Sequence, residues 1–347
     1  DRAGLGDGIA NMELLPNGIS GLANRIEELG MKFGLWIEPE MVNKDSDLYR
    51  KHPDWILQTP GRRVSHGRYQ YVLDFSRKEI VDYIYGMIAK LLSESNISYI
   101  KWDMNRSITE CYSIAYPADQ QGEIFHRYIL GVYDLYERLT SAFPEVLFES
   151  CASGGGRFDP GMLYYAPQGW VSDDSDAVER LKIQYGTSMC YPLSSMGSHV
   201  SVIPNHQVFR NTPLHTRANV AYFGTFGYEL DLNKLSDAEI EEVKAQIRFM
   251  KEYRELLQFG TFYRLKSPFN GNETVWMVVS EDKSKALVGY YRVLNGVNLP
   301  YSCVKLQGLD PDKLYENELA NTEHYGDELM NLGLITTDVS AGEVPQG

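Results

Sequence analysis

The sequence Ile97-Ser-Tyr-Ile-Lys-Trp-Asp-Met-Asn-Arg106 marks the point where a strand turns into a functional loop. An amphipathic helical pattern over residues 78–95 precedes it, and the apolar run from Tyr99 to Trp102 then gives way to charged and polar residues. In parallel α/β folds the carboxyl ends of the strands carry the working side chains, because the loops there vary while the sheet stays rigid. We therefore expect a strand that ends in chemistry at Asp103.

The alternation of side chains along this strand gives Asp103 a charged neighbour. A period of two residues places Lys101 and Asp103 on one face of the strand and Trp102 on the other. A cation on the same face favours the ionised form of the carboxyl group. A buried ion pair that only supports the fold produces the same pattern. The stretch by itself leaves both interpretations open.

Composition narrows the class of protein. With 347 residues, 43% of them hydrophobic, the chain is long enough for one large domain and a small one. The formal net charge of -14 argues against nucleic acid and anionic membranes as partners, because both require a positive surface. Tyrosine is common, with 24 residues, and its combination of ring and hydroxyl suits sugar sites as well as ordinary interfaces.

Cysteine and histidine patterns give no sign of a metal or a disulfide framework. The 4 cysteines lie far apart and form no CxxC pair, which fits a reduced compartment. The sequence begins without a signal region, and no apolar run reaches the length of a membrane span. The 7 histidines form no HExxH or similar pattern. We predict a cytoplasmic protein with no metal, no cofactor and no membrane or nucleic-acid partner.

Strands and helices alternate over residues 1–259, which predicts βαβ units and an α/β fold with a parallel sheet. About six strands are expected, two fewer than a closed eight-stranded barrel requires. Beyond residue 260 strands follow one another without helices, so residues 260–347 are predicted to form a small antiparallel β domain. The expected strands cover residues 31–37, 99–102, 146–149 and 169–171, more weakly 191–196 and 227–230, and then 274–280, 285–291 and 302–306. The expected helices cover residues 20–30, 78–95, 122–142, 177–189, 216–224 and 236–257, the first capped by Ser20 and the last by a capping box of Ser236 and Glu239.

Carboxylates gather at the predicted strand ends. Charged groups are rarely buried without a purpose, and a pair of carboxylates flanking one bond is the equipment of glycoside hydrolysis. Asp103, beside Lys101, is predicted to be the base or nucleophile. Repulsion within the cluster at residues 173–176 favours a retained proton, so one aspartate there is predicted to be the acid. Distances are needed to separate retaining from inverting chemistry. The carboxylates at strand ends are Glu38, Glu40, Asp103, Glu149, Asp173 and Asp174.

Two further features allow more than one interpretation. The glycine run at residues 154–156 follows a predicted strand, and such a run can bind a phosphate, let a sugar approach the main chain, or form a simple turn. It lacks the Gly-Lys-Ser/Thr of a P-loop and the spacing of a dinucleotide fingerprint. Trp36, at another strand end, can serve as a stacking platform for a sugar or pack in the core.

At these residues the sequence resembles glycoside hydrolase family 36, the bacterial retaining α-galactosidases. The resemblance covers nearly the whole chain, more loosely in the predicted β domain. It implies a (β/α)8 TIM barrel followed by a small C-terminal antiparallel β-sandwich, with about six of the eight βα units in this chain. The family's N-terminal β-sandwich and first two barrel strands have no counterpart here, so the domain at residues 1–259 is expected to be incomplete at its N-terminal side. The matching stretches are Gly34-Leu-Trp-Ile-Glu-Pro-Glu-Met41, His52-Pro-Asp-Trp55, Lys101-Trp-Asp-Met-Asn-Arg106, Glu149-Ser-Cys-Ala-Ser-Gly-Gly-Gly-Arg-Phe-Asp159 and Trp170-Val-Ser-Asp-Asp-Ser-Asp176.

The resemblance also implies roles for single residues and a substrate. Asp103 resembles the nucleophile that forms a covalent galactosyl-aspartate, and Asp173 resembles the acid/base. The implied reaction is hydrolysis of terminal, non-reducing α-D-galactosyl residues of raffinose-type oligosaccharides, in an enzyme that is often a homotetramer. The positions that resemble the lining of the galactose pocket are Trp36, Arg68, Lys101, Asn105, Cys151 and Gly154.

Other functions remain open on the sequence alone. An α-N-acetylgalactosaminidase and a galactosyl-transferring enzyme use the same machinery, because a glycosyl-enzyme can be intercepted by water or by another hydroxyl group. Cys151 favours galactose, since the resemblance places it near the 2-hydroxyl group, where an acetamido group needs more room. A non-catalytic sugar-binding fragment is the alternative from another class of protein.

Overall fold

The computed structural model describes residues 3–297 and 302–336 and forms two compact units, residues 1–173 and residues 174–347. The last residues of the predicted β domain, 337–347, lie outside the described residues. The domain boundary expected near residue 260 falls inside the second unit and stays a prediction. Within the described residues, no helix is both long and apolar enough to cross a membrane.

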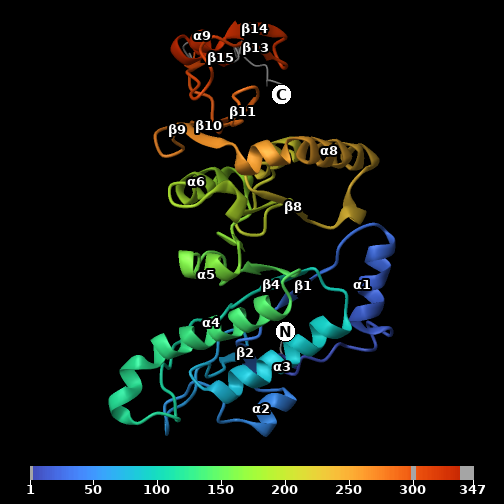
Figure 1. Ribbon diagram of the computed structural model, residues 1–347, viewed down its shortest axis with the longest axis vertical. Helices are drawn as coiled ribbons and strands as arrows, with labels where there is room; N and C mark the ends of the chain where they lie inside the picture. The colour runs from blue at the N-terminus through green and yellow to red at the C-terminus, as the bar shows by residue number, and fades with distance from the viewer. Residues whose placement is uncertain (1–2, 298–301, 337–347) are drawn as a thin grey trace. The chain divides into compact units, whose positions relative to one another are not determined.

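The first unit is built on a four-stranded parallel sheet in the order β1-β4-β5-β6. The strand β4 is where the sequence places it, and the long helices α3 and α4 precede β4 and β5 as the alternating pattern predicts (Figure 1). The short helix α5 before β6 was not predicted. The strands are β1 (Gly34–Ile37), β4 (Tyr99–Trp102), β5 (Leu147–Ser150) and β6 (Gln168–Gly169), and the helices are α1 (Gly18–Glu28), α3 (Lys78–Glu94), α4 (Ile124–Ala142) and α5 (Pro160–Tyr165), with a 3-10 helix, η1 (Ala118–Glu123), before α4.

The start of α1 differs from the prediction. Ser20 is not its N-cap, because the helix begins earlier and its N-cap is Asn17. The hydroxyl of Ser20 donates instead to the carbonyl oxygen of Glu94, at 2.6 Å, and so joins α1 to the end of α3. A hydroxyl at a helix start serves equally well as a tertiary contact, and local sequence does not separate the two roles.

The long connection between β1 and α3 is ordered around an antiparallel hairpin that the sequence did not predict. It pairs β2 (Met41–Asn43) with β3 (Gln70–Val72), and the short helix α2 (Asp47–Lys51) lies between them. Both strands are fully buried. With 3 residues each, they are too short to show an alternating pattern.

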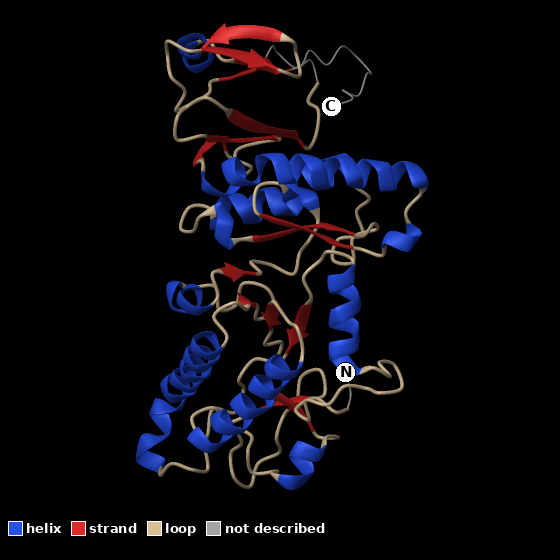
Figure 2. Ribbon diagram, turned by 45° about the vertical axis from the view of Figure 1, so that its right-hand side comes forward, coloured by secondary structure: helices blue, strands red, loops and turns tan. Residues whose placement is uncertain are grey.

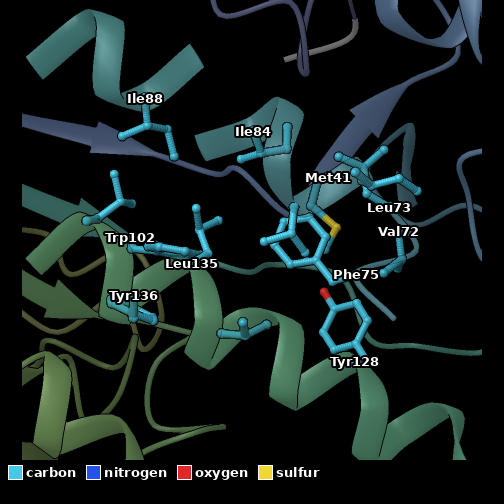
Figure 3. Close-up of a cluster of buried hydrophobic side chains, with 14 of the residues drawn as sticks. Met41, Val72, Leu73, Phe75, Ile84, Ile88, Trp102, Tyr128, Leu135 and Tyr136 are labelled. Atoms are coloured by element: carbon cyan, nitrogen blue, oxygen red, sulfur yellow. The ribbon is translucent and has the colours of Figure 1, made fainter. Parts of the chain in front are cut away.

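The hydrophobic core of the first unit lies between the sheet and the two long helices (Figure 3). Ile84 and Ile88 of α3 are buried four residues apart, on the helix face that the amphipathic pattern predicts. Trp102 of β4 is fully buried and stacks on Tyr136 of α4, with ring centroids 4.1 Å apart. The side of β4 opposite Lys101 and Asp103 therefore faces this core, as the alternation requires.

The second unit begins with two parallel strands flanked by helices (Figure 2). The capping box at the start of its longest helix is present as predicted. The strand predicted over residues 191–196 is wrong, because a 3-10 helix, η2 (Leu193–Ser195), occupies that segment and the strand follows it. The elements are α6 (Ala177–Thr187), β7 (Gly197–Ser201), α7 (Leu214–Ala221), β8 (Thr225–Glu229), η3 (Leu232–Lys234) and α8 (Asp237–Phe259). With the first sheet, β7 and β8 bring the parallel strands among the described residues to six. This agrees with the predicted number of about six, although β7 lies after the predicted segment.

The remaining strands are antiparallel and follow α8. A three-stranded sheet in the order β11-β10-β9 forms first, and β10 is buried on both faces because a second apolar cluster covers one of them and Phe223 and Phe262 contact Trp276 on the other. The elements are β9 (Thr261–Lys266), β10 (Glu273–Val279), β11 (Ala286–Arg292), β12 (Ser302–Val304), β13 (Leu314–Asn317), β14 (Thr322–Tyr325), α9 (Gly326–Asn331) and β15 (Leu334–Thr336).

Replacing Ile84 with alanine tests this account of the core. Ile84 is fully buried, so Ile84→Ala removes apolar contacts and leaves a cavity, at a cost of about 2–5 kcal/mol in the free energy of unfolding. Urea denaturation followed by circular dichroism measures the loss. Lys90→Ala, on the exposed face of the same helix, is the control and is expected to change stability by about 0.5 kcal/mol at most. Equal midpoints for the two variants would contradict the assignment.

Candidate active site

The parallel register places the predicted site residues in two layers on one face of the sheet. Trp36, Lys101 and Glu149 are register partners on β1, β4 and β5. Two residues further along each strand, Glu38, Asp103 and Cys151 form the next layer, beyond the last paired residues. Main-chain hydrogen bonds hold this upper layer, since Asp103 N donates to Ile37 O at 2.9 Å and Cys151 N to Trp102 O at 2.8 Å.

Asp103 is surrounded by hydrogen-bond donors. Its Oδ2 accepts from Asn105 Nδ2 at 2.6 Å and from Trp36 Nε1 at 3.1 Å, and its Oδ1 accepts from the main-chain N of Met104 at 2.9 Å. The thiol of Cys151 donates a further hydrogen bond. The side chain thus accepts hydrogen bonds from donors at three successive strand ends. The residue is only 7% exposed.

These donors decide the charge of Asp103. Burial by itself raises the pKa of its carboxyl group, but the hydrogen bonds from Cys151, Asn105, Trp36 and Met104 outweigh burial and lower the pKa below its ordinary value. Burial and the neighbouring Asp103 anion raise the pKa of Cys151 well above that of a free thiol. Cys151 is therefore a neutral donor at neutral pH, and Asp103 is a carboxylate with restricted solvation.

Lys101 plays a different part from the one that the sequence indicates. Its Nζ lies 3.1 Å from Oε1 of Glu149 and 4.6 Å from the centre of the Trp170 ring. Glu149 is 2% exposed and also accepts from Gln168 Nε2 at 3.0 Å and from the hydroxyl of Tyr99. In the layer of Trp36, Lys101 and Glu149, the cation of Lys101 thus pairs with the carboxylate of Glu149. The lowered pKa of Asp103 arises from hydrogen bonds.

Glu38 and Asn105 join the upper layer to the hairpin. Glu38 Oε1 accepts from the main-chain N of Asn105 at 2.8 Å, and its Oε2 accepts from Gln70 Nε2 on β3 at 2.8 Å. The side chain of Asn105 donates to Asp103 and accepts from the hydroxyl of Ser153, with 3.2 Å between oxygens. One asparagine therefore connects Glu38, Asp103 and the loop after β5.

The glycine run brings the segment before Asp173 against the loop after β5. Gly154 has a φ of 80°, and a Cβ there would lie 2.8 Å from the main-chain N of Asp173. A Cβ on Gly155 would lie 2.5 Å from the carbonyl oxygen of Val171. Both positions therefore require glycine, because two backbone segments approach each other closely there. The three interpretations of the glycine run stay predictions. Asp173 itself is exposed.

The aspartates after Asp173 have structural partners. Asp176 is the N-cap of α6, where it accepts from the main-chain N of Val178 and of Glu179, and it also pairs with Arg210. Asp174 accepts from the main-chain N of Asp176 at 3.1 Å. The cluster is thus a helix start in which hydrogen bonds stabilise the carboxylates, whereas the sequence argument counted only their mutual repulsion.

Glu40 belongs to the core. It is 0% exposed and forms a bidentate ion pair with Arg157, at 2.8 and 2.9 Å. It also accepts from Trp102 Nε1 at 2.8 Å and from the hydroxyl of Tyr128 at 2.5 Å. The sequence placed Glu40 among the strand-end carboxylates, but these side-chain contacts support the packing of β4, α4 and the loop after β5.

Arg68 and the surface pocket lie on the hairpin side of the site. Arg68 has a φ of 53°, is exposed, and acts on Glu38 through its positive charge. A pocket of about 720 Å³ is lined by residues 44–45, 63–64, 66, 69 and 71, which include none of the predicted site residues. Within the part of the chain that the structure describes, no group of three or more His, Cys, Asp or Glu side chains is placed to hold a metal ion.

Comparisons with known proteins identify the family. The melibiase family model matches residues 1–260, and the model of the glycosyl hydrolase family 36 C-terminal domain matches residues 273–343. The chain belongs to the melibiase family. Its α/β, TIM-barrel-like region with a strand-rich C-terminal part is the fold class that the sequence predicts.

Similar curated proteins and solved structures are α-galactosidases. The chain is 57% identical to α-galactosidase AgaA of Geobacillus stearothermophilus over 96% of this chain and 46% of that protein, and 50% identical to Mel36A of Lactobacillus acidophilus over 96% and 45%. The crystal structure of AgaA matches with a TM-score of 0.95 and 56% identity, covering 98% of this chain and 47% of that one. The chain therefore spans less than half the length of these relatives.

The sequence named most of the side chains that meet around Asp103 but missed the contacts between them. Glu38 was noted only as one of several carboxylates, and Gln70 and Ser153 were not noted at all. The position of Glu38, two residues after Trp36, gives the signal for its place in the upper layer. Gln70 and Ser153 give no such signal, because one lies on the unpredicted hairpin and the other in a loop.

The buried ion pair predicts a specific loss of stability. Arg157→Met leaves the carboxylate of Glu40 buried without its cation and should lower the free energy of unfolding by about 3–5 kcal/mol. The double variant Glu40→Gln with Arg157→Met removes both charges and should recover part of that loss, measured by urea denaturation. An Arg157→Met variant as stable as the unmodified protein would contradict the role of the pair.

Proposed function

We propose that the chain is the catalytic part of a retaining α-galactosidase that hydrolyses terminal, non-reducing α-D-galactosyl residues of raffinose-type oligosaccharides. The observation that carries the proposal is the state of Asp103, a carboxylate held ionised by four donors at the end of a parallel strand. Such a group is suited to attack an anomeric carbon.

In the first step, an oxygen of Asp103 forms a bond to the anomeric carbon as the bond to the leaving oxygen breaks. The carboxylate loses its negative charge in becoming an ester, and the donors from Asn105 and Trp36 keep the remaining carbonyl oxygen, Oδ2, in place. Water then attacks the same carbon, the ester bond breaks, and Asp103 returns to its ionised form.

Asp173 is proposed as the acid/base that protonates the leaving oxygen and then takes a proton from the attacking water. Its exposed side chain leaves it open to solvent and to a leaving group. Its main chain is fixed against Gly154, and Asp174 and Asp176 are engaged at the start of α6. These contacts support the choice of Asp173 within the cluster.

The galactose pocket is proposed to consist of the residues around Asp103. Trp36 is 38% exposed, so its ring can contact a sugar while Nε1 holds Asp103. Lys101, Asn105 and Arg68 supply polar groups, and Gly154 lets the main chain approach. The thiol of Cys151 is buried against Asp103. This close packing favours a hydroxyl over an acetamido group and therefore favours galactose over N-acetylgalactosamine.

The relatives support the substrate class. Crystal structures of variants of AgaA from Geobacillus stearothermophilus include complexes with raffinose, with stachyose and with 1-deoxygalactonojirimycin. At 55% identity in these structures, we extend the same class of substrate to this chain. A homotetrameric assembly and a cytoplasmic location also stay predictions, the second resting on the wide spacing of the cysteines, which are all free.

The nucleophile can be identified by trapping it. We expect the protein at its natural length, incubated with a 2-deoxy-2-fluoro-α-galactosyl donor that carries a good leaving group, to gain one fluorogalactosyl group on the peptide that contains Asp103. The fluorine slows hydrolysis of the ester, so the intermediate accumulates. Intact and peptide mass spectrometry measure the label. The Asp103→Ala variant should bind galactose but show neither label nor turnover, and label on another carboxylate would contradict the assignment.

A second variant tests the acid/base. Asp173→Ala should lower kcat/KM for raffinose by about 10²–10⁴. Its effect on the first step with an aryl galactoside of an acidic phenol should be far smaller, because that leaving group departs without a proton. Asp174→Asn is the neighbouring control, and any change in activity that it causes should be alike for the two substrates. An equal loss with both substrates in Asp173→Ala would argue against this role.

A further inference from the structure

Glu38 is a buried carboxylate to which the proposed reaction gives no role. It is 4% exposed and directly follows β1, as Asp103 follows the neighbouring strand β4. Its two hydrogen bonds, to Asn105 and Gln70, come from two separate elements, the loop after β4 and the hairpin strand β3. A buried charge at this position costs solvation free energy, so its presence calls for an explanation beyond packing.

The hydrogen-bonding pattern around Glu38 is that of a carboxylate. Both oxygens accept from N–H groups, and a protonated acid would need an acceptor for its own hydrogen. The amide oxygen of Gln70 has no hydrogen-bond partner within the described residues, so Gln70 is oriented by the donor that it presents to Glu38. A buried amide of the hairpin thus holds this anion.

Two charged side chains act on Glu38, one from the loop before β3 and one from the segment after β4. Arg68, in the loop before β3, favours the anion, whereas Asp103, after β4, disfavours it. Lys101 of β4 acts on Cys151, which contacts Asp103 from the end of β5. Burial is the largest effect and raises the pKa of Glu38. Two carboxylates therefore lie within electrostatic reach of each other, and donors from three strand ends stabilise them.

We propose that Glu38 is a positioning residue that fixes the nucleophile through Asn105, and that its negative charge makes the site selective for a galactosyl ring that carries positive charge. This inference rests on the proposed function, because it takes Asp103 as the nucleophile. The main chain of Asn105 is held by Glu38 and its side chain by Asp103, so movement of one carboxylate is transmitted to the other.

The charge of Glu38 has a consequence for the reaction. The transition state of glycoside hydrolysis resembles an oxocarbenium ion, with positive charge on the ring, whereas the ground-state sugar is neutral. A fixed anion at Glu38 favours that positive charge at both steps, and conversion of Asp103 into an ester removes the negative charge that disfavours this anion. Glu38 should therefore stabilise cationic ligands and leave the binding of neutral galactose almost unchanged.

Glu38→Gln separates charge from shape. The new amide can still accept from the N–H of Asn105, and rotation of the Gln70 amide offers its unpartnered oxygen to the new NH₂ group. We expect the affinity for 1-deoxygalactonojirimycin, a galactose-shaped ring that is cationic at neutral pH, to fall about tenfold or more. The affinity for galactose should change by less than about threefold, because the sugar carries no charge. Calorimetry on the protein at its natural length measures both.

Asp45→Asn is the matched control. It makes the same change in net charge at an exposed carboxylate, whose ion pair with Arg50 lies on the surface, and both affinities should stay as in the unmodified protein. The rate of labelling by the fluorinated donor should fall in Glu38→Gln, while the final extent stays one group per chain.

The possible outcomes are distinct. Selective loss of the cationic ligand in Glu38→Gln alone supports the proposal. Equal loss of both ligands would mean that Glu38 only maintains structure, and no loss of either would mean that its charge does not reach the site. Either result overturns the proposal while leaving the proposed function in place. Failure of the unmodified protein to bind either ligand would overturn both.

Discussion

The arrangement of the site depends on the parallel register between β1, β4 and β5. Register pairs Trp36 with Lys101 and Lys101 with Glu149, so that one layer of side chains lies across the sheet. Because side chains repeat every two residues on a face, the next layer falls just beyond the strand ends. Backbone hydrogen bonds continue one residue past each strand and hold that layer rigidly. The sheet therefore places the side chains of this layer, although their residues lie just beyond the strands.

The carboxylates of the two layers have different kinds of partner. In the layer within the strands, Glu149 forms an ion pair with Lys101 that supports the fold. Above, Asp103 has a thiol, an amide, an indole and a backbone N–H as donors, which keep it ionised without covering it with a cation. Hydrogen bonds stabilise the anion and also fix its orientation, whereas a direct ion pair would place a cation on one of its oxygens.

Much of the fold followed from local patterns. The helix α3 and the capping box of α8 were predicted because helical periodicity and capping chemistry act within a few residues. The hairpin of β2 and β3 was missed, since strands of three fully buried residues have no alternation to detect. The strand expected over residues 191–196 was displaced for a similar reason, because a short apolar run does not show where its pairing begins.

The sequence by itself determined which residues follow the strands and which face of β4 they share, because the alternation of side chains is a local property of an extended chain. It could not determine which carboxylates meet a cation, a helix start or a set of uncharged hydrogen-bond donors. Glu40, Asp103, Glu149 and Asp176 look alike in the sequence, yet each has different partners from segments far away in the chain. Only the tertiary structure decided these partners, since they depend on burial and on donors and cations that the fold brings together.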